Sequence, residues 1–60
     1  MKVGELIKRL EADGWVLARQ KGSHRHFKHP SKPGTVAVAG HPNQDLHPKT
    51  ERSVRRQAGW

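Results

Sequence analysis

The chain opens with apolar residues at helical spacing. Four of them fall at positions i, i+3, i+4 and i+7, namely Val3, Leu6, Ile7 and Leu10. This spacing puts the four side chains on one stripe and predicts an amphipathic helix over residues 2–12. Asp13 and Gly14 end the helix, because glycine most readily takes the left-handed conformation found at helix C-termini.

Three runs in the middle of the chain have the character of strands. Residues 15–19 and 23–29 form the first two, with a turn at residues 21–22 between them. Residues 35–39 form the third and are rich in β-branched side chains, which favour strands. Residues 30–34 predict the turn before it, because proline fixes φ and glycine permits a positive φ.

The last element is a second, strongly polar helix. Pro48 suits its first turn, because the missing N–H of proline would have no partner there, and Gly59 ends it. Its apolar positions are Val54 and Ala58, so the helix is either loosely held or supported by contacts from outside it. We expect those contacts from two flanking residues, Leu46 and Trp60.

The elements run in the order helix, strand, strand, strand, helix. Short connections between the strands predict antiparallel pairing, and both helices are expected to pack on one face of the sheet. The sequence therefore predicts an α+β fold of α-β-β-β-α order, with a three-stranded sheet whose other face is free for a ligand. At 60 residues the chain is a single domain, residues 1–60, with a small core.

Composition narrows the class of protein. Twelve Lys and Arg against five Asp and Glu give a net charge of +7, which on so small a surface attracts polyanions such as nucleic acids. An acidic protein partner, or a charge that only keeps the protein in solution, remains an alternative. There is no cysteine, no apolar run near the roughly 20 residues that span a bilayer, and no secretory leader. We therefore expect a soluble, cytoplasmic protein without a membrane partner.

The side chains able to do chemistry are concentrated in residues 22–30. Because side chains alternate along a strand, a core-facing Phe27 leaves His24, His26 and Lys28 together on the free face. The Cα atoms of His24 and His26 would then be about 6.6 Å apart, close enough for both to touch one phosphodiester. Alternation turns two other side chains toward the core side, those of Arg25 and His29.

Three roles compete for these histidines. They could be ordinary solvated residues of a strand. His24 and His26 could chelate a metal ion, but no cysteine and few acids are nearby to complete a zinc shell, so we predict neither a metal site nor a cofactor. The third role is acid–base cleavage of RNA, whose 2′-OH is a built-in nucleophile, so that an enzyme needs only a base, an acid and cations. DNA lacks this hydroxyl, and we do not expect the chain to act on it.

A resemblance to a known family covers nearly the whole chain. The matching segments are Glu5-Leu6-Ile7 with Leu10, Asp13-Gly14-Trp15, Gln20-Lys21-Gly22-Ser23-His24, Phe27-Lys28-His29-Pro30, Gly34-Thr35-Val36 with Val38, His41, Asp45-Leu46 and Arg56-Gln57-Ala58-Gly59. In order and spacing they resemble the HicA toxin family of bacterial toxin–antitoxin systems. Members of that family are small basic mRNA interferases with a fold like the double-stranded-RNA-binding domain.

The resemblance implies ribosome-independent cleavage of mRNA, growth arrest, and neutralisation by a HicB-type antitoxin that covers the site. It also implies that His24, the histidine of the Gly-Ser-His segment, is catalytic. His26 shares a strand face with His24, so we infer that it is the general acid, with a lysine as the alternative. Gly22 and Ser23 are expected to shape the turn that presents His24, and Phe27 to anchor the strand.

Cations around the histidines are expected to bind RNA. They are Arg19, Lys21, Arg25 and Lys28. Arginines 52, 55 and 56 of the last helix could form a solvated face, a phosphate-binding surface or a docking site for an acidic partner. The last helix departs from the family, which usually has glycine and then aliphatic residues where this chain has charged ones.

Two other polar residues are expected to have structural roles. Asp45 could orient a catalytic histidine, but an aspartate shortly before a helix more often caps it or turns the chain. His41 lies in a Gly-His-Pro turn and is expected to be a loop residue. Two rival functions use the same surface: a non-catalytic RNA-binding module, and a subunit that only binds an acidic protein.

Overall fold

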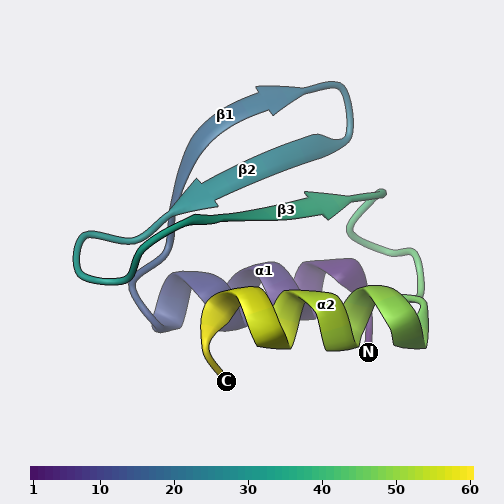
Figure 1. The fold of residues 1–60 in the computed structure, drawn as a ribbon. Helices are drawn as coiled ribbons and strands as arrows, with labels where there is room; N and C mark the ends of the chain where they lie inside the picture. Colours follow the sequence, from purple (N-terminus) through teal and green to yellow (C-terminus); the bar gives the residue numbers. More distant parts are fainter.

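A computed structural model describes all 60 residues of the chain and has two helices and three strands in the predicted order (Figure 1). The elements are α1 (Val3–Ala12), β1 (Val16–Lys21), β2 (His24–Lys28), β3 (Thr35–Ala39) and α2 (Pro48–Ala58). The predicted α-β-β-β-α order is confirmed. The first strand starts one residue later and ends two residues later than predicted, and the second is one residue shorter at each end.

The strands form one antiparallel sheet in the order β1-β2-β3, as predicted. β1 and β2 are joined by a two-residue turn, Gly22 and Ser23. Gly22 has a φ of 60° and Ser23 has no positive φ, which is the pattern of a type II′ hairpin turn. The turn predicted at residues 21–22 was one residue too early, because Lys21 already pairs with His24 in the ladder.

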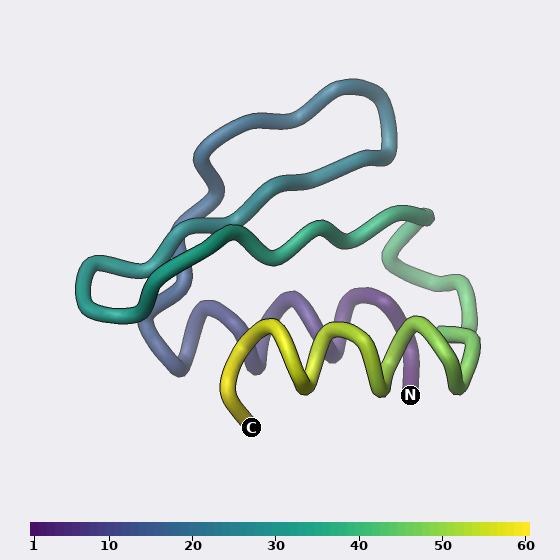
Figure 2. The backbone as a smooth tube through the Cα atoms, viewed as in Figure 1, coloured from purple at the N-terminus to yellow at the C-terminus, as the bar shows by residue number.

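Both helices lie on the same side of the sheet, as predicted, and both contact β3 (Figure 1). β1 forms the opposite edge of the sheet, and all six of its residues are exposed. The backbone tube in Figure 2 shows the hairpin of β1 and β2 extending away from the helices. The sheet therefore has a helix face, covered by α1 and α2, and an open face that no element covers.

The core fills the space between the helices and the sheet. Its nine buried side chains are Val3, Leu6, Leu10, Trp15, Phe27, Val36, Val38, Val54 and Ala58. They include three of the four residues predicted for the apolar stripe of α1, and the fourth, Ile7, is partly buried. Leu46 and Trp60 also pack against the core, as predicted, so α2 is held by more than its own two apolar residues.

A bulge in β1 decides which face its cations occupy. Leu17 pairs with Phe27, on the helix face. The next pair along the ladder is Arg19 with His26, so Ala18 is one extra residue in β1. Strict alternation from Leu17 would turn Arg19 toward the helices. The bulge instead shifts the remainder of β1 by one step and brings Arg19 to the open face beside His26.

One carboxylate ties the end of α1 to the rest of the chain. Oδ2 of Asp13 accepts three hydrogen bonds, from Lys32 Nζ at 2.7 Å, Trp15 Nε1 at 3.0 Å and Trp60 Nε1 at 3.1 Å. The bonds from Lys32 and then Trp60 lower the pKa of Asp13 to about 2, because they stabilise the ionised carboxylate. The Arg9 guanidinium lies 4.4 Å from the centroid of the Trp60 ring, so this indole is held by two contacts.

The start of α2 uses a cap that the sequence analysis did not identify. Nδ1 of His47 accepts a hydrogen bond from the backbone N–H of Lys49 at 3.1 Å, so His47 is the N-cap residue. Asp45 instead forms an ion pair with Lys2, at 3.1 Å between Oδ1 and Nζ, and bridges the chain to the start of α1. The predicted structural role of Asp45 is thus a link between two segments and not a helix cap.

Candidate functional site on the open face of the sheet

Side chains from neighbouring strands lie in rows across the open face. From the hairpin turn inward the rows are Lys21 with His24 and Ala39, Arg19 with His26 and Ala37, and Val16 with Lys28 and Thr35. Alternation about the buried Phe27 requires this arrangement, since Phe27 pairs with the buried Val36 of β3. Two histidines and three long cationic side chains therefore share one surface.

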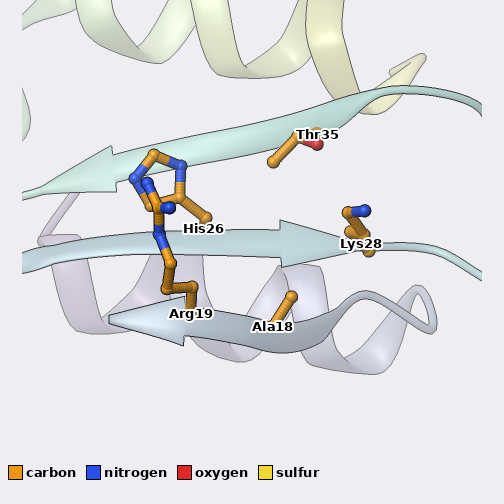
Figure 3. A pocket seen from close by; sticks show the side chains of 5 residues that line it. All are labelled: Ala18, Arg19, His26, Lys28 and Thr35. Carbon is orange, nitrogen blue, oxygen red and sulfur yellow. The ribbon is translucent and has the colours of Figure 1, made fainter. Parts of the chain in front are cut away.

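A hollow of about 330 Å³ lies on this surface (Figure 3). It is lined by Ala18, Arg19, His26, Lys28 and Thr35. Figure 3 shows Arg19 extending from β1 across β2 toward the His26 ring, while Lys28 and Thr35 lie at the other end. The hollow begins at His26 and extends away from His24, because the row of Lys28 lies on that side.

Every Lys, Arg, Asp or Glu side chain on the open face is a cation. All five acidic residues lie in the helices or the loops beside them, and none lies in a strand. The three ion pairs of the chain join Lys2 to Asp45, Lys32 to Asp13 and Arg55 to Glu51, so they also leave the strands out. Arg19, Lys21 and Lys28 have no partner of opposite charge, and their field is available to an anion from outside.

His24 and His26 are also without partners inside the chain. Neither ring makes a hydrogen bond to another residue, His24 is exposed, and His26 is half-buried. Both rings can therefore exchange protons with a bound molecule. Histidine is suited to this, because its imidazole ring can both accept and donate a proton.

Comparison with protein families identifies the chain. A family model described as HicA toxin of bacterial toxin–antitoxin matches residues 3–60. The chain belongs to the HicA toxin family. It is therefore a toxin of a toxin–antitoxin system, and the family implies an antitoxin as its partner. No curated protein matches the chain.

Not every cation predicted to bind RNA lies on the open face of this HicA-family chain. Arg25 pairs with the buried Val38 and so lies on the helix face. Its Nη1 donates a hydrogen bond to the carbonyl oxygen of Gly40 at 3.0 Å, which fixes the loop after β3. Of the three arginines in α2, Arg55 lies 3.9 Å from Glu51, and the other two are exposed.

The third histidine of the segment, His29, is part of the fold. Its Nδ1 accepts hydrogen bonds from the backbone N–H groups of Ser31 at 3.1 Å and Lys32 at 3.2 Å. Since backbone N–H groups are always donors, Nε2 carries the proton and donates it to the carbonyl oxygen of Asp13 at 2.7 Å. The ring also meets Trp15 edge-on, with centroids 5.2 Å apart. Both ring nitrogens are occupied, so His29 is not available for catalysis.

The turn residues and the anchor lie where the sequence placed them. Gly22 and Ser23 connect β1 to β2 next to His24, and Phe27 is 1% exposed beneath the site. Sequence reasoning missed Ala18 and Thr35, which complete the hollow. Thr35 could have been found from an antiparallel register of β2 and β3, whereas the bulge that places Ala18 has no signal in the sequence.

The structure offers neither a metal-binding group of side chains nor a membrane-spanning helix. The chain brings no three histidine or acidic side chains together in a group that could hold a metal ion. Neither α1 nor α2 combines the length and the apolar composition that crossing a membrane requires.

Proposed function

We propose that this HicA-family toxin is a ribosome-independent endoribonuclease that cleaves mRNA in the cytoplasm by histidine acid–base catalysis. The observation that carries the proposal is the pair of His24 and His26 on the open face. Both lack a partner in the fold, and the cations around them are also unpaired. Growth arrest follows from loss of mRNA.

The pair fits the chemistry of a transesterification. His24, as base, takes the proton of the 2′-OH, whose oxygen attacks the adjacent phosphorus. The bond from phosphorus to the 5′ oxygen breaks, and His26, as acid, gives that oxygen a proton. The products are a 2′,3′-cyclic phosphate and a 5′-hydroxyl, so atoms and protons balance. No redox partner or metal ion is needed.

The unpaired cations would stabilise the charge that builds on the phosphate. Arg19 is the cross-strand neighbour of His26, and Lys21 is that of His24, so each histidine has a cation beside it. Fixed charges aimed at the developing charge of a transition state contribute strongly to catalysis. Each positioned acid or base contributes roughly 10²- to 10⁴-fold in rate.

The natural partner in this proposal is a HicB-type antitoxin that covers the open face. A partner with acidic residues would match the surplus positive charge of Arg19, Lys21 and Lys28. Blocking this face removes access to both histidines at once, which would explain neutralisation without any change in the fold.

The test compares the same substitution, histidine to asparagine, at two positions: one on the open face of the sheet and one at the start of α2. His24→Asn is expected to lower cleavage of a defined RNA at least about 100-fold in excess chelator, while RNA binding persists. His47→Asn is the matched control, because asparagine caps a helix well and the residue lies away from the sheet. We expect this control to cut at the wild-type rate.

Two results would decide against the proposal. If His24→Asn cleaves RNA as fast as the control variant does, then His24 is not a catalytic residue. RNA binding without cleavage by the wild-type chain would instead support a non-catalytic RNA-binding module that uses the same face.

A further inference from the structure

The hollow on the open face lies beside the proposed catalytic pair and extends away from it. His24 and His26 are two residues apart on β2, and Lys28 lies two residues further in the same direction. Each such step along a strand covers about 6.6 Å. An RNA strand with its scissile phosphate at His24 and His26 can therefore continue over His26 into the hollow.

The lining of the hollow suits an anion. Arg19 and Lys28 supply two positive charges, Thr35 supplies a hydroxyl, and no acidic residue lies on any strand. The remaining walls are His26 and Ala18, and the small side chain of Ala18 leaves the space open. Charged hydrogen bonds of this kind are the usual way in which proteins hold phosphate.

A nucleobase is a poorer fit to this surface than a phosphate. Bases of single strands are usually held by stacking on the rings of Phe, Tyr, Trp or His or on the guanidinium plane of Arg. In the hollow, only His26 and Arg19 are of these types, and they lie at the end next to His24. The three aromatic residues of types Phe and Trp lie elsewhere: Trp15 and Phe27 are buried in the core, and Trp60 packs with Arg9 and Asp13. The far end of the hollow offers the ammonium group of Lys28 and the hydroxyl of Thr35 for the backbone of RNA, and no ring or guanidinium on which a base could stack.

We propose that this hollow is a second phosphate subsite, which holds the phosphate next to the scissile one along the RNA. The inference rests on the proposed function, because it takes His24 and His26 as the position of the scissile phosphate. Lys28 and Thr35 bind the second phosphate at the far end, and Arg19 lies between the two phosphates. The bulge in β1 builds the subsite by adding Ala18 to its wall and turning Arg19 to the open face.

Short DNA is the probe, because it has the phosphates of RNA without the 2′-OH and cannot be cut by this chemistry. Dithymidylate has one phosphate, and its 5′- or 3′-phosphorylated forms have two. Binding is measured by calorimetry or by NMR shifts at low ionic strength. We expect one of the doubly phosphorylated forms to bind roughly fivefold more tightly than dithymidylate, as for two solvent-accessible charged contacts. Which form gains affinity reports the direction of the strand.

Two variants remove the subsite by different means. Lys28→Gln removes its charge, and Ala18→Leu fills the hollow without changing any charge. Both are expected to abolish the gain from the second phosphate. Lys49→Gln is the matched control, because it removes the same charge from an exposed position on α2. We expect this variant still to bind the doubly phosphorylated probe more tightly than dithymidylate.

The possible outcomes separate the subsite from the proposed function. Equal binding of the singly and doubly phosphorylated probes by the wild-type chain overturns the subsite, as does a gain that survives in Ala18→Leu and Lys28→Gln. Cleavage of RNA is measured on the same wild-type protein. If it cuts RNA but shows no gain, the subsite is lost and the nuclease stands. If it shows the gain but does not cut RNA, the anion site stands and the nuclease is lost.

Discussion

The helix face and the open face of the sheet use charge in opposite ways. All three ion pairs of the chain lie on the helix side, as in the contacts of Asp13 with Lys32 and of Asp45 with Lys2, while exposed helix cations such as Lys8 and Lys49 have no such partner. On the open face there is no acid, and the cations of β1 and β2 have none to pair with. A charge with an internal partner supports the fold, whereas a surface of unpaired like charges attracts an external anion.

The histidines divide in the same way. His29 uses both ring nitrogens in hydrogen bonds within the fold, and His47 caps α2. His24 and His26 use neither ring nitrogen. Residue type therefore says little about role in this chain, and the number of internal partners says more. Substitutions at the two kinds of histidine should therefore separate catalysis from stability.

The largest effect is expected at His26. Replacing it with asparagine should lower RNA cleavage by roughly 100-fold or more, because the leaving oxygen loses its acid. The free energy of unfolding should change by less than about 0.5 kcal/mol, because His26 makes no hydrogen bond within the chain. Rates and urea denaturation of the same preparation measure both quantities. A large loss of stability would place His26 with the structural histidines.

His29 should show the reverse pattern. His29→Ala removes the bond to the Asp13 carbonyl, the acceptor for two backbone N–H groups and the contact with Trp15. We expect a loss of about 2 kcal/mol in the free energy of unfolding, which lowers the Tm of so small a domain by about 8–16 °C. Cleavage at a temperature where the variant is folded should persist. A variant as stable as the wild type would show that these bonds contribute nothing.

Lowering the pH should reduce the free energy of unfolding, because it protonates the Asp13 carboxylate that ties the end of α1 to the rest of the chain. Its pKa is lowered from 3.8 to about 2 by the hydrogen bonds of Lys32, Trp60 and Trp15, so the folded state favours the ionised carboxylate. This contribution is complete above about pH 4 and is lost as the pH falls toward 2. Asp13→Asn should be less stable at neutral pH and lose less on acidification. Denaturation curves between pH 6 and pH 2 test this, and parallel curves for both proteins would contradict it.

The smallest effect is expected from single cations. Lys21→Gln, on the open face, should reduce the slope of log affinity for single-stranded RNA against log salt by about 0.7, the value of one lost phosphate contact. Lys8→Gln removes the same charge from an exposed position of α1 and should leave the slope unchanged. Equal slopes for the two variants would mean that the faces do not differ toward RNA.

Local patterns were enough to predict most of the fold. The apolar spacing of α1, the proline and glycine at the ends of α2, and the alternation around Phe27 each involve residues close in sequence. The contacts of Asp13 are different, because Trp60 lies 47 positions away and Lys32 lies 19 away. No periodic pattern in the sequence indicates contacts between residues so far apart. They form only when both helices meet the sheet.

The candidate site was predicted in part. The grouping of His24, His26 and Lys28 followed from alternation within one strand. The place of Arg19 depended on the bulge, which arises from how β1 pairs with β2 and not from its composition. Arg25 was expected to bind RNA from its neighbours in sequence, although alternation turned it toward the core side, and its bond to Gly40 lies on that side. Neighbours in sequence are a poor guide to function where a strand alternates.

The bulge also bears on how β1 can change in length. Removing a residue from a strand normally reverses every side chain beyond the deletion. Ala18 is an exception, because its loss would leave Leu17 opposite Phe27 and Arg19 opposite His26 in a regular ladder, with every pair kept as it is. Homologous chains one residue shorter at this point could keep the same cation beside the same histidine, and an alignment that ignores the gap would pair residues from opposite faces.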